Sequence, residues 1–317
     1  MVLDSPPTIA LIGAGQMGSK LAYRMVQHGA GTILTNLEGR SEATWRRATE
    51  CGMKHASYRD IVSQATYILS VVPPSEAFAI AQAIACTSKE ICLSRKVIFA
   101  DCNAVNPETA KQIAQLFVGT GITFIDGAVV GGPPSDVYNP GVYICADGKD
   151  EADLDELDIV LRKYGLNPFS LKGEGSGVGD ASAVKMANSG VVKGAMALFA
   201  SMILASHASS PSTCQGLLHS LIISQPSFLD QLILFIPQMT PKAYRFVNEM
   251  QEVAKFGGDE GIARIYEGTA EVFQRIARAR EQATPGDGGD LDLLLTAVED
   301  GKKVRALGEC KKADGLT

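Results

Sequence analysis

The sequence predicts an α/β domain with a parallel sheet, followed by an all-α domain. Two observations lead to this fold class. Short apolar segments alternate with helical segments through the first half of the chain, and strand patterns end after a glycine-rich stretch near its middle. Strands that alternate with helices form crossover units, which place the strands parallel in one sheet. The 317 residues are enough for two domains, each with its own core.

The first domain is predicted to contain short strands and the helices between them. Short apolar runs bounded by turn residues indicate the strands. The expected strands are Thr8–Ile12, Thr32–Leu37, Tyr67–Val72, Val97–Asp101, Thr123–Asp126, Gly141–Ala146 and Asn167–Leu171. The expected helices are Gln16–His28, a helix around Ser41–Cys51, one that begins near Pro107, and Asp150–Tyr164.

Four glycines in the seven residues Gly173–Gly179 mark the boundary between the domains. We predict the α/β domain over residues 1–175 and the all-helical domain over residues 176–317, beginning with a long interdomain helix. The expected helices of the second domain are Ala181–Ala208, Ser224–Phe235, Pro241–Phe256 and Gly261–Arg280, followed by a turn at Thr284–Gly289 and a short final helix.

Composition excludes several classes of function. The net charge of −6 argues against a nucleic-acid-binding face, which is normally basic. Seven cysteines form no CxxC pair and have no metal-ligand spacing, so we expect reduced thiols in a reducing compartment and no metal site. The N-terminus lacks a basic region followed by an apolar run, so we expect a cytoplasmic protein. Gly194–Leu229 carries no charged residue, but the break at Ser209–Ser212 argues against a membrane span.

A glycine-rich motif lies between the first strand and the first helix. The motif is GxGxxG, formed by Gly13, Ala14, Gly15, Gln16, Met17 and Gly18. In this context Gly13 permits the tight turn, Gly15 lets the backbone approach a pyrophosphate, and Gly18 lets the helix pack on the strand. The helix N-terminus faces the phosphates with its unpaired N–H groups. The motif therefore predicts a Rossmann domain that binds NAD(P), and the alternative is a glycine-rich turn without a ligand.

Residues after the second strand are expected to choose the cofactor. Glu38 lies where an acid binds the ribose hydroxyls of NAD. Arg40 and Ser41 are suited to the 2′-phosphate of NADP, and together they favour NADP over NAD. Two alternatives stay open: Glu38 points away from the cofactor, or Arg40 is a surface residue that pairs with Glu42.

Further cofactor contacts are expected where later strands end. Val72 ends the third expected strand and Pro73 follows it, and we predict that they line the cofactor groove. Asn103 follows the fourth strand at the sheet edge where α/β proteins bind ligands. Asn103 either contacts the nicotinamide or substrate or caps the helix that begins near Pro107.

Hydride transfer to a carbonyl or imine needs a proton donor close to the nicotinamide. No histidine lies at a persuasive position; His55, for example, is expected in a polar loop. Lys185 lies early in the long apolar helix and shares one face with Asn188 and Ser189. From the residues alone, two interpretations of Lys185 are open. It is either a buried lysine with a functional role or a lysine that extends its ammonium to the surface.

Three segments carry a resemblance to a known family: IGAGQMG at Ile12–Gly18, DGAVVGG at Asp126–Gly132, and GSGVGDASAVKMANS at Gly175–Ser189. Over roughly residues 8–280 the chain resembles the β-hydroxyacid dehydrogenase family, related to 6-phosphogluconate dehydrogenase. The resemblance implies that Lys185 protonates the substrate carbonyl and that Asn188 assists. It also implies that the substrate carboxylate is bound by Val130, Gly131, Gly132 and Ser189.

The chain departs from the family pattern at several positions. Val130 replaces a serine, Ser189 replaces an asparagine, and Arg245–Ala254 stands where the family often has Lys-Asp. After the second strand the usual Asn-Arg is Asn36 followed by Leu37. These departures indicate a divergent branch with an atypical C-terminal domain, and they leave the substrate open.

The sequence therefore predicts an oxidoreductase that transfers hydride between NADPH and a carbonyl or hydroxy compound resembling a 3-hydroxy acid, with Lys185 as general acid and base. The first alternative is an imine reductase or reductive aminase, although these enzymes commonly have Asp or Tyr at the position of Lys185. The second is a nucleotide-binding protein without turnover. The apolar helix Gly190–Ala208 resembles family helices that pack against a partner subunit, so we expect a homodimer that binds neither nucleic acid nor membrane.

Overall fold

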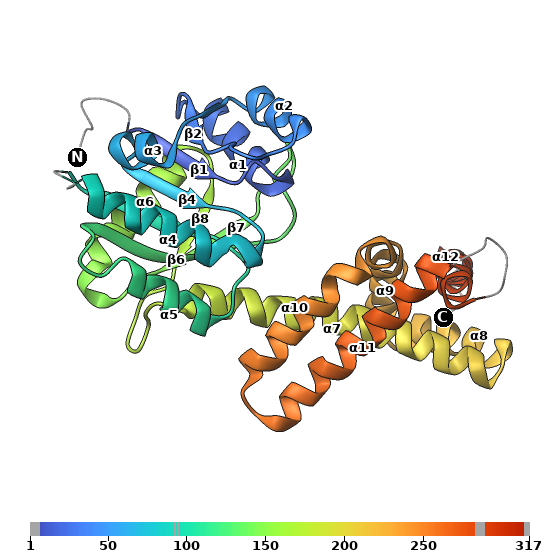
Figure 1. The fold of residues 1–317 in the computed structure, drawn as a ribbon. Helices are drawn as coiled ribbons and strands as arrows, with labels where there is room; N and C mark the ends of the chain where they lie inside the picture. Colours follow the sequence, from blue (N-terminus) through green and yellow to red (C-terminus); the bar gives the residue numbers. More distant parts are fainter. Residues whose placement is uncertain (1–6, 92, 94, 283–288, 314–317) are drawn as a thin grey trace. The chain divides into compact units, whose positions relative to one another are not determined.

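The computed structural model describes residues 7–91, 93, 95–282 and 289–313. The chain divides into two compact units, Met1–Met186 and Ala187–Thr317. The first unit is an α/β domain and the second is entirely helical across its described residues, which confirms the predicted fold class (Figure 1). The structural division falls inside the long helix, whereas the sequence placed the boundary between residues 175 and 176.

The first unit is built on an eight-stranded sheet in the order β3-β2-β1-β4-β5-β6-β7-β8. The strands are β1 (Ile9–Ile12), β2 (Ile33–Thr35), β3 (Met53–His55), β4 (Tyr67–Ser70), β5 (Val97–Asp101), β6 (Ile122–Val130), β7 (Gly141–Cys145) and β8 (Asn167–Ser170). All neighbours are parallel except β6 and β7, which pair antiparallel. The order reverses direction between β1 and β4, so their carboxyl ends form the edge at which such sheets bind ligands.

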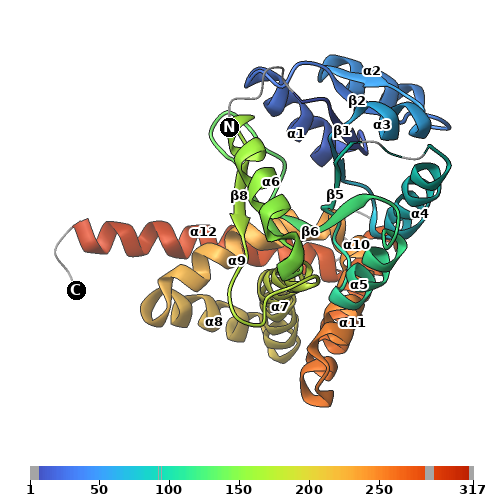
Figure 2. The same cartoon turned by 90° about the vertical axis from the view of Figure 1, so that its left-hand side faces the viewer.

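Helices cover both faces of this sheet: α1 (Gln16–Gln27), α2 (Glu42–Glu50), α3 (Tyr58–Gln64), α4 (Pro74–Ile91), α5 (Pro107–Leu116) and α6 (Glu151–Lys163). Successive side chains of a strand point to opposite faces. Ile9 and Leu11 of β1 therefore enter the core under α1 and α6, whereas Ala10 and Ile12 enter the core under α3, α4 and α5. Figure 2 shows α6 on one side of the strands and α4 and α5 on the other.

Several elements of the first unit differ from the sequence prediction. Strand β3 and helices α3 and α4 were not predicted, and β6 continues past Asp126 to Val130. His55 was expected in a polar loop, and this was wrong, because it ends β3 and its Nδ1 accepts a hydrogen bond from the Leu37 N–H at 3.1 Å. Strand β3 has three residues, which is too short for a strand pattern to be recognised.

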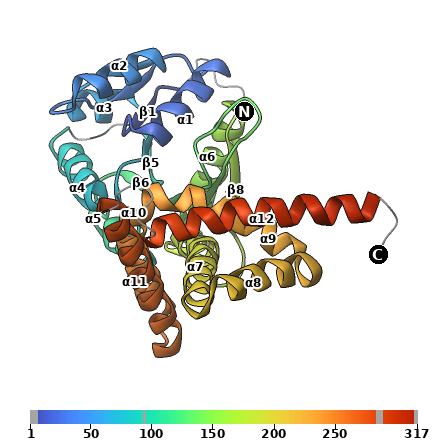
Figure 3. The same cartoon turned by 90° about the vertical axis from the view of Figure 1, so that its right-hand side faces the viewer.

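The second unit contains the rest of α7 (Asp180–Ser209), which begins in the first unit, and five further α-helices among its described residues. These are α8 (Pro211–Ser224), α9 (Pro226–Met239), α10 (Ala243–Gly257), α11 (Glu260–Gln282) and α12 (Asp290–Ala313). Helix α10 packs along α11, and α12 packs on α8 and α9 (Figure 3). Helix α8 was not predicted, and the final helix has 24 residues rather than being short. The expected turn at Thr284–Gly289 lies almost wholly outside the described residues.

Among the described helices, α7 is long and apolar enough to cross a membrane by length and composition. The buried core helix of a protein that never enters a membrane meets the same criterion.

Candidate cofactor and catalytic site

The glycine motif forms a tight turn between β1 and α1. A Cβ atom on Gly13 would lie 2.1 Å from the Val71 carbonyl oxygen, and one on Gly18 would lie 1.9 Å from the Gly13 carbonyl oxygen. Gly13 also has a φ of +114°, so packing and backbone conformation both require glycine there. A Cβ on Gly15, by contrast, would meet nothing within 4 Å. The turn thus leaves open space in front of the N-terminus of α1, which fits a bound pyrophosphate.

The remaining motif residues differ in exposure. Ala14 is buried, Gln16 is exposed, and Met17 is half-buried against the core. Gly15 is the N-cap of α1 and has no side chain to occupy the first-turn N–H groups of the helix. The structure therefore brings the predicted motif residues together in the arrangement that phosphate binding needs.

Arg47 contacts this turn and was missed by sequence reasoning. Its Nε donates to the Ala14 carbonyl at 3.2 Å, and its Nη2 lies 3.4 Å from Thr44 Oγ1. Ser41 caps α2, because its Oγ accepts from the Thr44 N–H at 3.4 Å. Ser41, Thr44 and Arg47 follow at spacings of three on one helix and form a polar row that ends at the phosphate turn.

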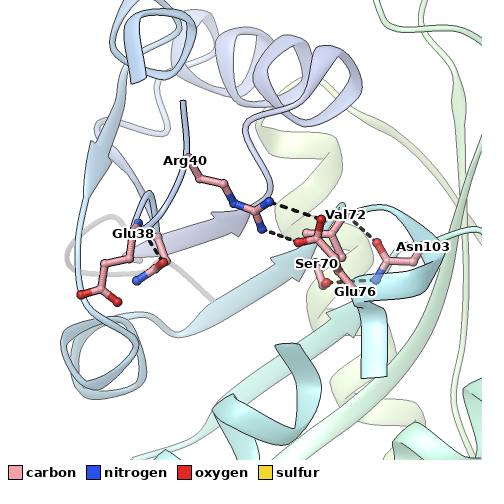
Figure 4. Close-up of polar contacts among 7 residues, drawn as sticks. Glu38, Arg40, Ser70, Val72, Glu76 and Asn103 are labelled. Atoms are coloured by element: carbon pink, nitrogen blue, oxygen red, sulfur yellow. Dashed lines mark hydrogen bonds and ion pairs between the residues drawn. The ribbon is translucent and has the colours of Figure 1, made fainter. Parts of the chain in front are cut away.

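Arg40 reaches across to α4. Its guanidinium binds the Glu76 carboxylate through both terminal nitrogens, and the Nη1–Oε1 distance is 3.3 Å. Figure 4 shows that the Glu38 side chain points away from Arg40, while the Glu38 N–H donates to Asn36 Oδ1 at 3.2 Å. Arg40 thus pairs with Glu76 rather than with Glu42 in this structure. The Arg40 hydrogen bond lowers the pKa of Glu76, so the carboxylate is ionised at neutral pH.

Asn103 joins the ends of two neighbouring strands. Its Oδ1 accepts from the Val72 N–H at 2.6 Å, and its Nδ2 donates to Ser70 Oγ at 3.0 Å and to Asp101. The alternative that Asn103 caps the next helix is wrong, because Asn106 caps α5. Asn103 is 3% exposed, and its hydrogen bonds fix the Val72 N–H just beyond the carboxyl end of β4 (Figure 4).

Two buried aspartates face each other on adjacent strands. Asp101 of β5 and Asp126 of β6 are register partners. Asp126 accepts four hydrogen bonds, whereas Asp101 Oδ2 has no hydrogen-bond partner among the described residues. Burial, and then the charge of Asp126, raise the pKa of Asp101 to about 7. Because Asp126 accepts four hydrogen bonds that favour its ionised form, Asp101 is the member of the pair that takes up a proton as the pH falls through about 7.

Replacing Asp101 by asparagine is expected to stabilise the first unit by about 1–3 kcal/mol at about pH 8, and by much less at about pH 5. The pKa of Asp101 is raised, so its stabilising contribution is complete below about pH 4 and is lost as the pH rises through about 7. Urea unfolding followed by the fluorescence of Trp45 measures the free energy of unfolding of this unit, because Trp45 is the only tryptophan of the chain and lies in α2. Asp136→Asn, at an exposed acid, is the control. Equal effects at both pH values would contradict the assignment.

The start of α7 is bound to the middle of β6. Asp126 Oδ2 accepts from the Gly179 N–H at 3.0 Å and the Ser182 N–H at 3.1 Å, and Oδ1 accepts from Ser182 Oγ at 2.7 Å. The Cys145 thiol donates to the same carboxylate at 3.3 Å. Asp126 therefore caps the helix that carries Lys185.

Lys185 lies at the carboxyl end of β6. Its Nζ donates to the Val129 carbonyl at 2.8 Å, and the side chain is half-buried. Val130 ends the strand, and the exposed residues Gly131 and Gly132 follow in the loop between β6 and β7. The structure thus places the predicted catalytic lysine next to the predicted substrate loop, within one unit.

Tyr138 is a second residue that sequence reasoning missed. A Cβ on Gly131 would lie 1.9 Å from the Tyr138 hydroxyl oxygen, so the phenol closes directly over this glycine. The Ser135 N–H donates to the Tyr138 carbonyl at 2.8 Å and bends the loop back on itself. The Tyr138 hydroxyl, which can both donate and accept a hydrogen bond, therefore lies at the loop that follows Val130.

The two predicted residues that follow Lys185 on α7 belong to the second unit. Asn188 is exposed, whereas Ser189 is 2% exposed. The Ser189 hydroxyl donates to Glu249, and Lys193 Nζ lies 2.7 Å from Ser189 Oγ and 2.6 Å from Glu249 Oε1. Ser189 therefore takes part in a polar link between α7 and α10.

Comparisons with known proteins bear on this arrangement. Residues 8–171 match the family described as the NAD binding domain of 6-phosphogluconate dehydrogenase, and residues 208–276 match a domain of unknown function, DUF1932. No curated protein matches the chain.

Solved structures share the fold. The conserved protein MTH1747, described as similar to 3-hydroxyacid dehydrogenases, is 26% identical, with 87% of this chain and 98% of that chain covered and a TM-score of 0.66. The 3-hydroxyisobutyrate dehydrogenase of Mycobacterium tuberculosis is 15% identical, with 92% and 99% covered and a TM-score of 0.64. The V8 variant of an imine reductase from Myxococcus stipitatus, in complex with NAD+, is 17% identical, with 92% and 100% covered and a TM-score of 0.53.

The nucleotide-binding match covers more than half of the 317 residues, and it coincides with the unit that holds the phosphate turn. The resemblance predicted from the sequence is thereby confirmed. The chain belongs to the family of the NAD binding domain of 6-phosphogluconate dehydrogenase, joined here to a DUF1932 domain, and its structural neighbours include 3-hydroxyacid dehydrogenases.

Proposed function

We propose that the protein transfers hydride between NADPH and a carbonyl or hydroxy compound resembling a 3-hydroxy acid, with Lys185 as general acid and base. The observation that carries this proposal is the Lys185 ammonium, bound to the Val129 carbonyl beside the Gly131–Gly132 loop. The same unit holds the phosphate turn. A proton donor, a substrate loop and a cofactor turn are the parts that this reaction needs.

Lys185 moves the proton in this mechanism. When bound, the nicotinamide supplies or accepts the hydride. Lys185 gives a proton to the carbonyl oxygen as negative charge develops there, and it takes the proton back when an alcohol is oxidised. The Val129 carbonyl fixes the direction of the ammonium, and Asn188, three residues along the helix, orients Lys185 or the substrate. The N–H groups of Gly131 and Gly132, with the Tyr138 hydroxyl, bind the polar end of the substrate.

The cofactor would be bound at three places along the first unit. The first-turn N–H groups of α1, reached past Gly15, would bind the pyrophosphate, and Arg47 braces this turn. Arg40 and Ser41 would bind the 2′-phosphate, which favours NADP. Val72 and Pro73, with Val72 fixed by Asn103, would line the nicotinamide side of the groove.

Replacing Arg40 by alanine is expected to weaken NADPH binding about 10- to 100-fold, because a hydrogen-bonded charge is worth about 1.5–3 kcal/mol. NADH has no 2′-phosphate, so its Kd should change less than about two-fold. Fluorescence titration of both cofactors measures these effects. Arg46→Ala, at an exposed neighbouring arginine, is the control. Equal weakening of NADPH and NADH would contradict the selection of NADP by Arg40.

Imine reduction is the second candidate, and the fold shared with an imine reductase favours it. The experiment that separates the candidates measures nicotinamide absorbance with 2- and 3-oxo acids, uncharged aldehydes and ketones, and cyclic imines. Oxidation of NADPH by a carbonyl compound would support the first candidate, and oxidation by imines alone would support the second. Tight cofactor binding without turnover of any compound would indicate a nucleotide-binding protein.

We further propose that the protein is a cytoplasmic homodimer that uses the second unit for assembly and binds neither nucleic acid nor membrane. Val191, Leu198 and Met202 of α7 expose 71%, 61% and 48% of their surface. Their spacing places them along one stripe of the helix, where a second copy would cover them. Sedimentation at micromolar concentration tests this, and a monomer there would contradict it.

A further inference from the structure

Helix α4 presents a carboxylate to the guanidinium that the proposed function assigns to the 2′-phosphate. Glu76 lies in the first turn of α4, and Arg40 lies in the loop between β2 and α2. Both Arg40 terminal nitrogens contact the two Glu76 carboxylate oxygens, with Nη1 and Oε1 3.3 Å apart, as Figure 4 shows. The Nη1–Nη2 edge of Arg40 is therefore occupied by an anion of this same chain.

Glu76 dominates the electrostatic surroundings of Arg40. The pKa of Glu76 is lowered by the Arg40 hydrogen bond, so Glu76 carries a full negative charge at neutral pH. Tyr58, the first residue of α3, is also close, because Arg40, Glu76 and Glu38 all shift its pKa. Arg40 thus has one carboxylate and one phenol in its electrostatic surroundings, because the Glu38 side chain points away from it, and the bidentate contact is made by Glu76.

We propose that Glu76 determines cofactor selectivity by competing with the 2′-phosphate of NADP for Arg40. A carboxylate and a phosphate bind a guanidinium in the same fork geometry, so both cannot occupy the Nη1–Nη2 edge. If the phosphate used the remaining edge, it would still lie near the Glu76 charge and be repelled by it. NAD has a hydroxyl at this position, so its binding leaves the ion pair intact.

The ion pair is suited to displacement. The side chains of Arg40 and Glu76 are 38% and 35% exposed, and ion pairs in such positions are weak because water screens them. A phosphate dianion can therefore displace Glu76 from the Arg40 guanidinium, but it has to compete with the carboxylate to do so. Arg40 makes the affinity for NADPH higher than the affinity for NADH, and Glu76 accordingly reduces this difference. The inference rests on the proposed function, because it requires Arg40 to bind the 2′-phosphate.

The experiment compares Glu76→Gln with wild type by fluorescence titration of NADPH and NADH. We expect NADPH to bind about three- to ten-fold more tightly to Glu76→Gln at low salt, because an adjacent anion is removed. NADH should change less than about two-fold, and the gain for NADPH should shrink as salt is added. Glu42→Gln is the matched control, since it removes one negative charge close by without touching the Arg40 pair.

A double-mutant cycle isolates the pair. In the Arg40→Ala background, Glu76→Gln should tighten NADPH binding clearly less than it does in the wild-type background, because only direct repulsion by the carboxylate is left to relieve. An unchanged or weaker affinity in Glu76→Gln alone, or an equal gain in the Arg40→Ala background or in Glu42→Gln, would overturn the inference. Thermal melting confirms that each variant is folded, and Glu76→Ala repeats the test with a second side chain. If wild type and Glu76→Gln bind neither cofactor, the proposed function fails and this inference fails with it.

Discussion

Replacing Lys185 by methionine is expected to lower kcat about 10²- to 10⁴-fold, the range supplied by a positioned general acid. Lys185 Nζ is fixed 2.8 Å from the Val129 carbonyl, at the strand end that leads into the Gly131–Gly132 loop. Methionine has a similar length but carries no proton to donate. Steady-state turnover with the best carbonyl substrate measures the loss, and fluorescence titration should show the Kd for NADPH unchanged.

Lys193→Met is the matched control for this prediction. Lys193 is another lysine on α7, two turns further along, and it binds Glu249 instead of a strand end. Its removal should affect the stability of the second unit more than the chemistry. A Lys185→Met enzyme that keeps more than about a tenth of its kcat, or that loses only cofactor affinity, would exclude Lys185 as the general acid.

Replacing Asp126 by alanine is expected to destabilise the first unit by about 3–5 kcal/mol, because it leaves several buried donors without an acceptor. The Gly179 and Ser182 N–H groups and the Ser182 hydroxyl all bind this carboxylate. Activity should fall as well, because the turn of α7 that carries Lys185 loses its attachment to β6. Urea unfolding followed by Trp45 fluorescence measures the stability.

Asp180→Ala is the matched control for the Asp126 prediction. Asp180 is the first residue of α7, and its carboxylate accepts one backbone hydrogen bond, from the Gly177 N–H at 3.0 Å. Its loss should cost about 0.5–1.5 kcal/mol, the net contribution of one ordinary hydrogen bond. A similar, small effect of both substitutions would contradict a special role of Asp126 in attaching the helix.

Local sequence patterns were sufficient to predict most of the fold. The strand Val97–Asp101 was predicted with its observed bounds, because its apolar run is flanked by polar turns. Helix α8 was missed because Ser, Thr, Cys, Gly and His interrupt its apolar face and it has no charged residue to mark a polar side. The antiparallel pairing of β7 with β6 was missed because the loop between these strands shows no short hairpin turn.

The candidate site also contains residues that the sequence predicted and residues that it did not. The phosphate turn and the Lys185 helix were found because each is one continuous segment whose spacing has a physical meaning. The partners Glu76, Tyr138 and Glu249 were not found, because only the folded chain brings them to Arg40, Gly131 and Ser189. Pairing across many residues depends on the register of the sheet and the packing of helices, which no local pattern specifies.

Deuterium transfer tests the central claim, that this chain moves hydride from a nicotinamide to a substrate carbon. NADPH labelled with deuterium at the transferable position of the nicotinamide would be incubated with the wild type and the best carbonyl substrate. Mass spectrometry of the product should show one deuterium on the former carbonyl carbon, and Lys185→Met should form this product far more slowly. Unlabelled product, or bound NADPH that is never oxidised by any carbonyl or imine, would contradict the proposed function.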